Sequence, residues 1–215
     1  MLLWSLAAMA QQPWQIGPSP SASDTESGLA FAAHTTFAGR PEHKGGNGRV
    51  TAAFGAGRRF WFSGEVARGT SWRTCPSCDA IAFDGTARVL AIDTSIFNGA
   101  VWGGVSATPN ASEGSTGAPM LTAGLAFELD LGRVAFDTSI PVFASSDPWD
   151  QLWSSPELGA RFAWTKRNTT RVALVGFDPH IGLTHRLRFG IFGFEVTART
   201  SDAGPLVEGG LRLQL

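Results

Sequence analysis

The sequence predicts an all-β fold: a closed, antiparallel, up-and-down transmembrane β-barrel of twelve strands, with ten strands as the alternative. Three observations predict it. Apolar and polar residues alternate with period two along most of the chain, as in strands whose two faces differ. A weak repeat joins successive strands across tight turns. Longer connections join the opposite ends of these strands.

Composition narrows the class of protein further. Charged residues make up 16% of the chain, below the ~25% of an ordinary soluble domain, and apolar residues make up 43%. The net charge of −1 offers no basic surface for nucleic acid. No apolar run approaches the ~20 residues that a membrane-spanning helix needs.

The N-terminal segment predicts export from the cytoplasm. Residues 1–10 are apolar and end in Ala8-Met9-Ala10, a small-residue cleavage signature. We therefore expect a signal peptide at 1–10; a positively charged start is missing, and an ordinary N-terminal tail is the alternative. Residues 11–27 are rich in Gln, Pro and Ser and are expected to be a flexible lead-in, so that 28–215 form the barrel domain.

The alternation assigns faces to the strands. Segment 121–129 places Leu, Ala, Leu, Phe and Leu on one face and Thr, Gly, Ala and Glu on the other. Segments 134–140 and 158–164 divide in the same way. The residues expected to face lipid are Leu121, Leu125, Phe127, Leu158, Phe162, Trp164, Leu211 and Leu213.

The repeat places the strands along the chain. An Arg followed by an apolar residue starts the second strand of each unit, at Arg59, Arg88, Arg133, Arg171 and Arg188. The strands are expected near 28–37, 49–56, 59–68, 80–84, 87–97, 120–129, 133–143, 157–165, 170–177, 180–187, 188–199 and 206–215. The long connections are 39–48, 69–79, 98–119, 144–156 and 200–205, and Asn98-Gly99 predicts a small ribbon inside the third of them. Merging 170–187 gives the ten-strand alternative, and a bulge is expected near Gly190 or Gly193.

The last strand carries a family resemblance. Apolar residues and one Gly alternate to the final position, at Val207, Gly209, Leu211, Leu213 and Leu215. This resembles the C-terminal signal strand of bacterial outer-membrane β-barrel proteins, which usually ends in Phe or Trp rather than Leu. The resemblance implies an outer-membrane location in a two-membrane envelope, contact with outer-membrane lipid and recognition of this strand by the barrel-insertion machinery. The chain has no Tyr for an aromatic girdle, a role that could pass to Trp61, Trp72, Trp149, Trp153 and Trp164.

The polar face distinguishes a membrane barrel from a soluble exported barrel that binds a small ligand. Both have period two, but a soluble barrel is polar outside. Here the polar face is rich in Ala, Gly, Ser and Thr, and the only lysines, Lys44 and Lys166, fall in connections. A closed barrel in lipid needs an apolar exterior and tolerates such a polar interior.

The charges of this polar face are the candidate site. The predicted lumen-lining residues are Glu65, Asp93, Glu128, Asp137, Glu157, Arg161, Arg171, Glu208 and Arg212, with Arg49 as a further inward candidate. One interpretation is an ion-pair network that fills a narrow lumen. The other is a passive channel for small solutes, whose selectivity depends on Glu65, Glu128, Asp137 and Arg161. No cofactor and no metal are expected.

An enzyme acting on lipid or peptide at the external rim is the alternative function. Such an enzyme needs a His beside a nucleophile or carboxylate. His43 and His180 fall in predicted connections and could meet Asp147 and Asp150, whereas His185 repeats the position of Phe127 and is expected at the membrane interface. The sequence has no G-x-S-x-G or H-E-x-x-H motif.

The two cysteines, Cys75 and Cys78, lie close together in a predicted external loop. In an exported protein this spacing favours a local disulfide. A redox pair would need a helix N-terminus, and a zinc site would need two more ligands nearby; the sequence indicates neither.

Replacing both Cys75 and Cys78 with Ser is expected to leave the heat resistance of the barrel nearly unchanged. The loop that they close is very short, so its cross-link removes little entropy from the unfolded chain. Thermal unfolding of the purified protein measures this. Loss of folding, or stoichiometric zinc in the purified protein, contradicts the disulfide interpretation.

Overall fold

The computed structural model describes residues 28–38, 48–57, 59–69, 80–107, 120–144, 156–175, 180–199 and 206–215. The strands are β1 (Gly28–Ala38), β2 (Gly48–Ala56), β3 (Phe60–Gly69), β4 (Ala80–Asp93), β5 (Phe97–Ala107), β6 (Met120–Asp130), β7 (Val134–Ala144), β8 (Glu157–Thr165), β9 (Asn168–Val175), β10 (His180–Phe189), β11 (Phe192–Arg199) and β12 (Leu206–Gln214). Across these stretches no helix has the length and apolar character needed to cross a membrane. The signal peptide, the lead-in and both cysteines fall outside them.

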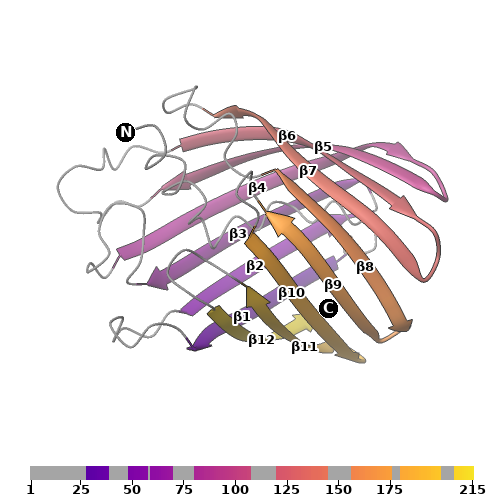
Figure 1. The fold of residues 1–215 in the computed structure, drawn as a ribbon. Coiled ribbons are helices and arrows are strands. Elements are labelled where there is room, and N and C mark those ends of the chain that lie inside the picture. The colour runs from indigo at the N-terminus through magenta and orange to yellow at the C-terminus, as the bar shows by residue number, and fades with distance from the viewer. Residues whose placement is uncertain are drawn as a thin grey trace.

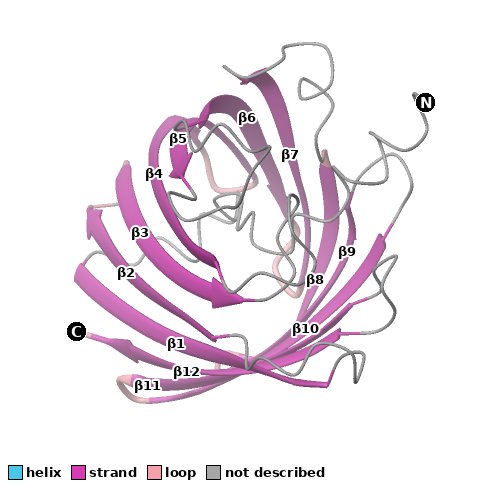
Figure 2. Ribbon diagram, turned by 90° about the vertical axis from the view of Figure 1, so that its left-hand side faces the viewer, coloured by secondary structure: helices cyan, strands magenta, loops and turns pink. Residues whose placement is uncertain are grey.

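The twelve strands form one closed antiparallel barrel, in which each strand pairs with its sequence neighbours and β1 pairs with β12. Figure 2 shows the strands encircling the interior. At the seam, Leu29 N–H donates to Leu215 O at 3.2 Å and Leu215 N–H donates to Leu29 O at 2.8 Å. The predicted all-β barrel is confirmed with twelve strands rather than ten.

The connections at the two ends of the barrel differ in length, as predicted. At one end, strands join through residues 57–59, 94–96, 131–133, 166–167 and 190–191. At the other end, the connections span 39–47, 70–79, 108–119, 145–156, 176–179 and 200–205. In Figure 1 these short turns gather at the right of the tilted strands. Outer-membrane-type barrels have this asymmetry, with their short turns on the periplasmic side.

The predicted turn at Asp84-Gly85 was wrong. β4 runs through it without interruption, and Gly85 pairs with Gly64 on β3 and with Val105 on β5. The turn lies instead after Asp93, where Thr94 Oγ1 accepts hydrogen bonds from the N–H of Phe97 at 2.8 Å and of Ile96 at 3.4 Å. Asn98-Gly99 therefore belongs to β5, a full barrel strand in what was predicted as a long connection. The count of twelve is nevertheless preserved, because 80–84 and 87–97 merge while β5 is added.

The boundary between β10 and β11 was also misplaced. The prediction started a strand at Arg188, but Arg188 is the ninth residue of β10. The chain turns at Gly190 and Ile191, where Gly190 has φ 61°, a conformation that glycine adopts without steric cost. The expected bulge is therefore a turn, and it places Arg188 and Phe194 on opposite faces, because Arg188 pairs with Gly193 and Leu187 pairs with Phe194.

The outer face of the barrel is apolar. Val101, Leu125 and Ile140 pair side by side across β5, β6 and β7, and Val101 and Ile140 are 50% and 42% exposed. The intervening inner residues Ala126 and Glu128 are 0% and 1% exposed. A soluble barrel has the opposite arrangement, so the soluble alternative is excluded.

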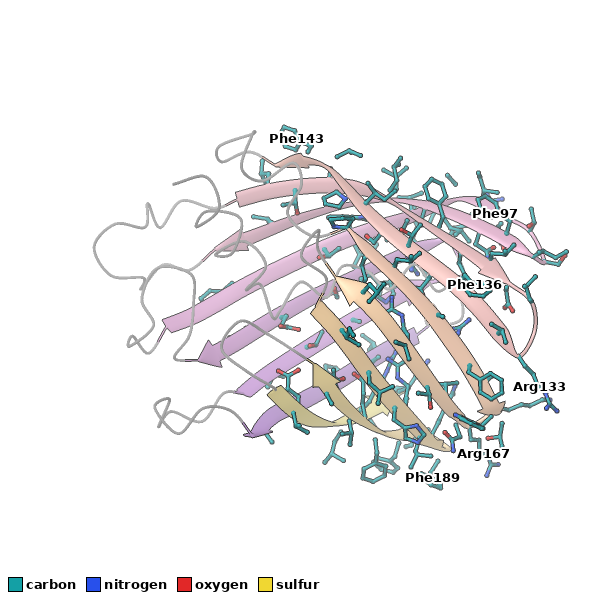
Figure 3. The ribbon with its side chains drawn as sticks, in the orientation of Figure 1. Phe97, Arg133, Phe136, Phe143, Arg167 and Phe189 are labelled. Atoms are coloured by element: carbon teal, nitrogen blue, oxygen red, sulfur yellow. The ribbon has the colours of Figure 1, made fainter. Side chains whose placement is uncertain are left out.

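Large aromatic residues lie near both ends of this outer face. Phe143 is 50% exposed near the long-connection end, and Phe189 and Trp164 are 55% and 59% exposed near the short turns. Figure 3 shows Phe143 and Phe189 projecting away from the ribbon. Trp61 does not belong to this girdle: it pairs with Arg88, a buried inner residue, so its assignment to the girdle was wrong. Of the other candidate tryptophans, Trp72, Trp149 and Trp153 lie outside the described residues.

Replacing Leu125 with Arg is expected to destabilise the inserted barrel by about 2–4 kcal/mol, because Leu125 lies midway along β6 on the outer face. Equilibrium unfolding in phospholipid vesicles measures the change. Leu125→Met is the control, since an apolar side chain of similar volume usually costs less than ~1.5 kcal/mol. Equal stability of the Arg and Met variants means that the assigned face is wrong.

Candidate functional site: the charged inner wall

Two buried carboxylates face each other on the inner wall. Glu128 on β6 pairs in register with Asp137 on β7, and they are 1% and 2% exposed. Asn98 on β5 pairs with Glu128 on the other side and is 4% exposed. Carboxylates this close and this buried need positive partners, because the desolvation of each charge is otherwise uncompensated.

Arg171 on β9 supplies the partner of Asp137. Its Nε donates to Asp137 Oδ2 at 3.0 Å and its Nη2 donates to Asp137 Oδ1, which gives a bidentate pair. Its Nη1 also forms an ion pair with Glu157 Oε1 on β8. The guanidinium therefore joins three strands of the wall.

This bridge passes over Gly159 on β8, which lies between Asp137 and Ala173 in the same transverse row. A Cβ built at Gly159 would lie 2.5 Å from both Arg171 Nη2 and Asp137 Oδ1. Real Cβ atoms do not approach other atoms so closely. Any side chain at this position would displace the ion pair.

Arg161 on β8 lies against the second carboxylate. Its Nη2 is 3.6 Å from Glu128 Oε1, and its side chain is 15% exposed, compared with 1% for Glu128. Arg171 keeps 22% of its side chain exposed. Both arginines thus neutralise buried acids and still reach solvent inside the barrel.

A second part of the inner wall is packed rather than open. Arg88 on β4 is 3% exposed, pairs with Trp61 and Trp102, and lies 5.6 Å from the centroid of the Trp61 ring in a cation–π contact. Trp102 covers Gly124 on β6, where a Cβ would lie 2.5 Å from its Cε2. Leu90, Ala100, Trp102 and Ala126 form a buried apolar cluster here.

Further inner charges lie on β3, β10 and β11. Glu65 on β3 is 7% exposed and accepts a hydrogen bond from Thr51 at 2.9 Å. On β10 and β11, Arg186 pairs with Glu195 at 2.8 Å, with 31% and 16% of the two side chains exposed. Thr184 and Thr197 share a hydrogen bond of 3.1 Å beside them.

Most of the predicted lumen-lining residues lie on the inner face of the barrel. Glu65, Glu128, Asp137 and Glu208 are buried on the inner face, and Glu157, Arg161, Arg171 and Arg212 are half-buried there. Asp93 is exposed where β4 ends at the short turn, and it pairs with Asn98. The structure joins Asp137, Glu157 and Arg171 in one cluster and Glu128 with Arg161 in another. The side chain of Arg49 lies outside the described part of the structure.

Several inner residues were missed. Arg88 and Asn98 were placed in or beside turns that do not exist, so their faces could not be counted. Arg186 and Glu195 could have been assigned from period two, because Arg186 lies between the outer residues His185 and Leu187, and Glu195 lies between Phe194 and Val196.

The structure does not describe the side chains of the two histidines predicted for the enzyme alternative. His43 and the side chain of His180 lie outside the described part of the structure. His185 faces outward and shares a hydrogen bond of 2.9 Å with Thr170, its one interaction within the described part of the chain. The described residues hold no group of three or more His, Cys, Asp or Glu placed to bind a metal ion.

Similarity to solved structures is clear in the fold and weak in the sequence. No family model and no curated protein matches the chain. The KdgM porin in complex with disordered oligogalacturonate is 12% identical, with a TM-score of 0.61 over 86% of this chain and 99% of that chain. Outer membrane phospholipase A from Escherichia coli is 6% identical, with a TM-score of 0.53 over 89% of this chain and 97% of that chain.

The predicted resemblance to outer-membrane β-barrels is confirmed at the level of the fold. A second structure of the KdgM porin is 11% identical, with a TM-score of 0.60. One fold thus holds both a porin and a phospholipase. The fold does not decide between a channel and an enzyme, which leaves the residues of this chain to do so.

Gly159→Ala is expected to destabilise the barrel by about 1–3 kcal/mol, because the added methyl group displaces the Arg171–Asp137 pair in a packed wall. Urea unfolding in phospholipid vesicles measures this change in the free energy of unfolding. Gly182→Ala is the matched control: Gly182 lies in the same transverse row, and the nearest atom to its Cβ is 4.0 Å away. If both variants lose equal stability, the ion pair does not depend on the space at Gly159.

Proposed function

We propose that this protein is an integral β-barrel of the bacterial outer membrane that passes small polar solutes through a narrow, charge-lined lumen. The observation that carries the proposal is the partial exposure of inner-face arginines. Arg161, Arg171 and Arg186 keep 15%, 22% and 31% of their side chains exposed although they face away from the membrane. An interior packed throughout would leave no such surface for water.

The arrangement of charges supports a weakly selective channel. Arg161, Arg171 and Arg186 are each paired with at least one inner acid, so neither sign dominates in these pairs. Selectivity follows the charges at the narrowest part of a pore. The similarity to a porin agrees with conduction, and the balanced pairs indicate no preference for an acidic solute such as the oligogalacturonate bound to the KdgM porin.

The structural-barrel interpretation and the enzyme interpretation remain as outcomes of the test. Signal-peptide removal at 1–10, the disulfide and recognition of the last strand by insertion machinery stay predictions. For the enzyme, His43 and His180 are the residues to replace. His185 has no described carboxylate partner, which a Ser–His–carboxylate type of hydrolase would use to orient its base.

Glu128→Gln combined with Asp137→Asn is expected to shift the reversal potential in planar bilayers toward anions. The two changes remove the acidic partner of Arg161 and one of the two acidic partners of Arg171, which makes the lumen more positive. Arg161→Gln should shift the potential in the opposite direction. Asp130→Asn, which removes a half-buried acid at the short-turn end of β6, is the control and should change the reversal potential less.

Three results would contradict this proposal. Insertion of the wild type without any conductance means that the barrel is structural and packed. Loss of a hydrolytic activity on lipid or peptide in His43→Ala or His180→Ala, with no effect of the charge variants on reversal potential, supports the enzyme. Equal shifts in the Asp130 control and the double variant mean that the inner carboxylates do not set selectivity.

A further inference from the structure

Basic side chains gather at the short-turn end of β6–β9. Arg133 lies in the turn after β6, and Lys166 and Arg167 form the turn after β8; all three are exposed. Within the described part of the chain, none of the three takes part in an ion pair. Asp130, the acid beside Arg133, accepts a hydrogen bond from Gly132 N–H at 2.8 Å.

Backbone hydrogen bonds hold these turns next to one another. Ala163 N–H donates to Arg133 O at 2.8 Å, which joins the turn after β6 to β8. Arg188 N–H donates to Arg167 O at 2.8 Å, which joins the turn after β8 to β10. Figure 3 shows Arg133 and Arg167 at the same end of the barrel, beyond the ends of the strands.

A chain of polar side chains lies on the outer face just above the turn after β8. Trp164 Nε1 donates to Thr170 Oγ1 at 2.9 Å, and Thr170 Oγ1 lies 2.9 Å from His185 Nδ1. Trp164 is 59% exposed and packs edge-on against Phe162, with 4.6 Å between the ring centroids. Polar side chains on a lipid-facing surface are costly unless they lie at the level of the headgroups.

The position of Thr170 meets this condition. It is the third residue of β9, so it lies about 7 Å along the strand from the turn, and less along the membrane normal because barrel strands tilt by ~45°. When the Thr170 hydroxyl donates to Nδ1 of His185, Nδ1 is the unprotonated ring nitrogen, and the N–H of the neutral imidazole is at Nε2. That N–H is a donor for an oxygen at the membrane surface.

We propose that these residues bind the phosphate group of an anionic phospholipid in the leaflet at the short-turn end. The site, here called the rim niche, consists of Lys166, Arg167, Trp164, Thr170 and His185. Lys166 and Arg167 neutralise the phosphate, Trp164 lies at the interface where indole rings are favoured, and His185 donates to a phosphate or ester oxygen. Arg133 adds positive charge from the neighbouring turn.

The test compares spin-labelled phosphatidylglycerol with spin-labelled phosphatidylcholine on the full-length barrel in phosphatidylcholine vesicles. Electron paramagnetic resonance gives the relative association of each lipid with the protein. The wild type should prefer phosphatidylglycerol by several-fold, because each cation near an anionic headgroup contributes about a five-fold preference. The preference should decrease as salt is raised, because these cations are exposed.

Matched variants separate the rim niche from general attraction. Arg167→Gln should lower the preference severalfold, whereas Arg59→Gln, which removes the same charge from the exposed turn after β2, should leave most of it. Thr170→Val should lower it without changing charge, because Trp164 loses its acceptor and His185 loses the hydroxyl that orients it. Millimolar inorganic phosphate should not displace the lipid.

Several results would overturn the rim niche. They are equal association of the two lipids with the wild type, a preference that does not depend on salt, an equal loss in the Arg59 and Arg167 variants, or displacement of the lipid by inorganic phosphate. If a variant fails to fold, the salt dependence of the lipid preference of the wild type tests whether the exposed cations attract the anionic lipid. Conductance plays no part in the measurement, so the result is independent of the proposed channel.

Discussion

Closure of the sheet is the constraint on which the rest of the structure depends. A chain that crosses hydrocarbon must pair every backbone N–H and C=O within the protein, and an open sheet edge would leave a row of them unpaired. The pairing of β1 with β12 removes that edge, and Leu29 and Leu215 complete the seam with two hydrogen bonds. Once the ring is closed, successive side chains must point alternately to lipid and to the interior. Period two therefore determines which residues meet inside the barrel.

The interior charges follow from this geometry. Because Glu128 and Asp137 occupy inner positions on paired strands, their carboxylates are brought together whatever their mutual repulsion. Removing one partner of a buried ion pair typically costs about 3–5 kcal/mol, so the arginines opposite are as necessary to the fold as to any selectivity. Arg171 reaches Asp137 only because Gly159 between them has no side chain. Gly159, which has no charge and no side chain, is thus a necessary part of the charged site.

Local patterns predicted the fold class, the strand count and the outer face, because alternation is a property of each strand alone. Turns were predicted less well. Asp84-Gly85 resembles a turn, but Gly85 has ladder partners on both sides, at Gly64 and Val105, and these outweigh the preference of the dipeptide. The alternation predicted both the acids and the arginines of the site. It did not predict which acid pairs with which arginine, because Arg171 and Asp137 are 34 positions apart in the sequence and meet only through the register of β7, β8 and β9.

The inner wall has two physically different halves, and this locates the path of a solute under the proposed function. On β4–β6, Arg88 lies against Trp61 of β3, and Leu90, Trp102 and Ala126 pack into a buried cluster. Water has little access there. On β8–β11, arginines of similar size stay partly exposed, up to 31% for Arg186. A polar solute that crosses the barrel therefore follows the second half, where Arg161 and Arg171 hold their acids on one side and meet water on the other. The same ion pairs that stabilise the wall would then set the field through which the solute moves.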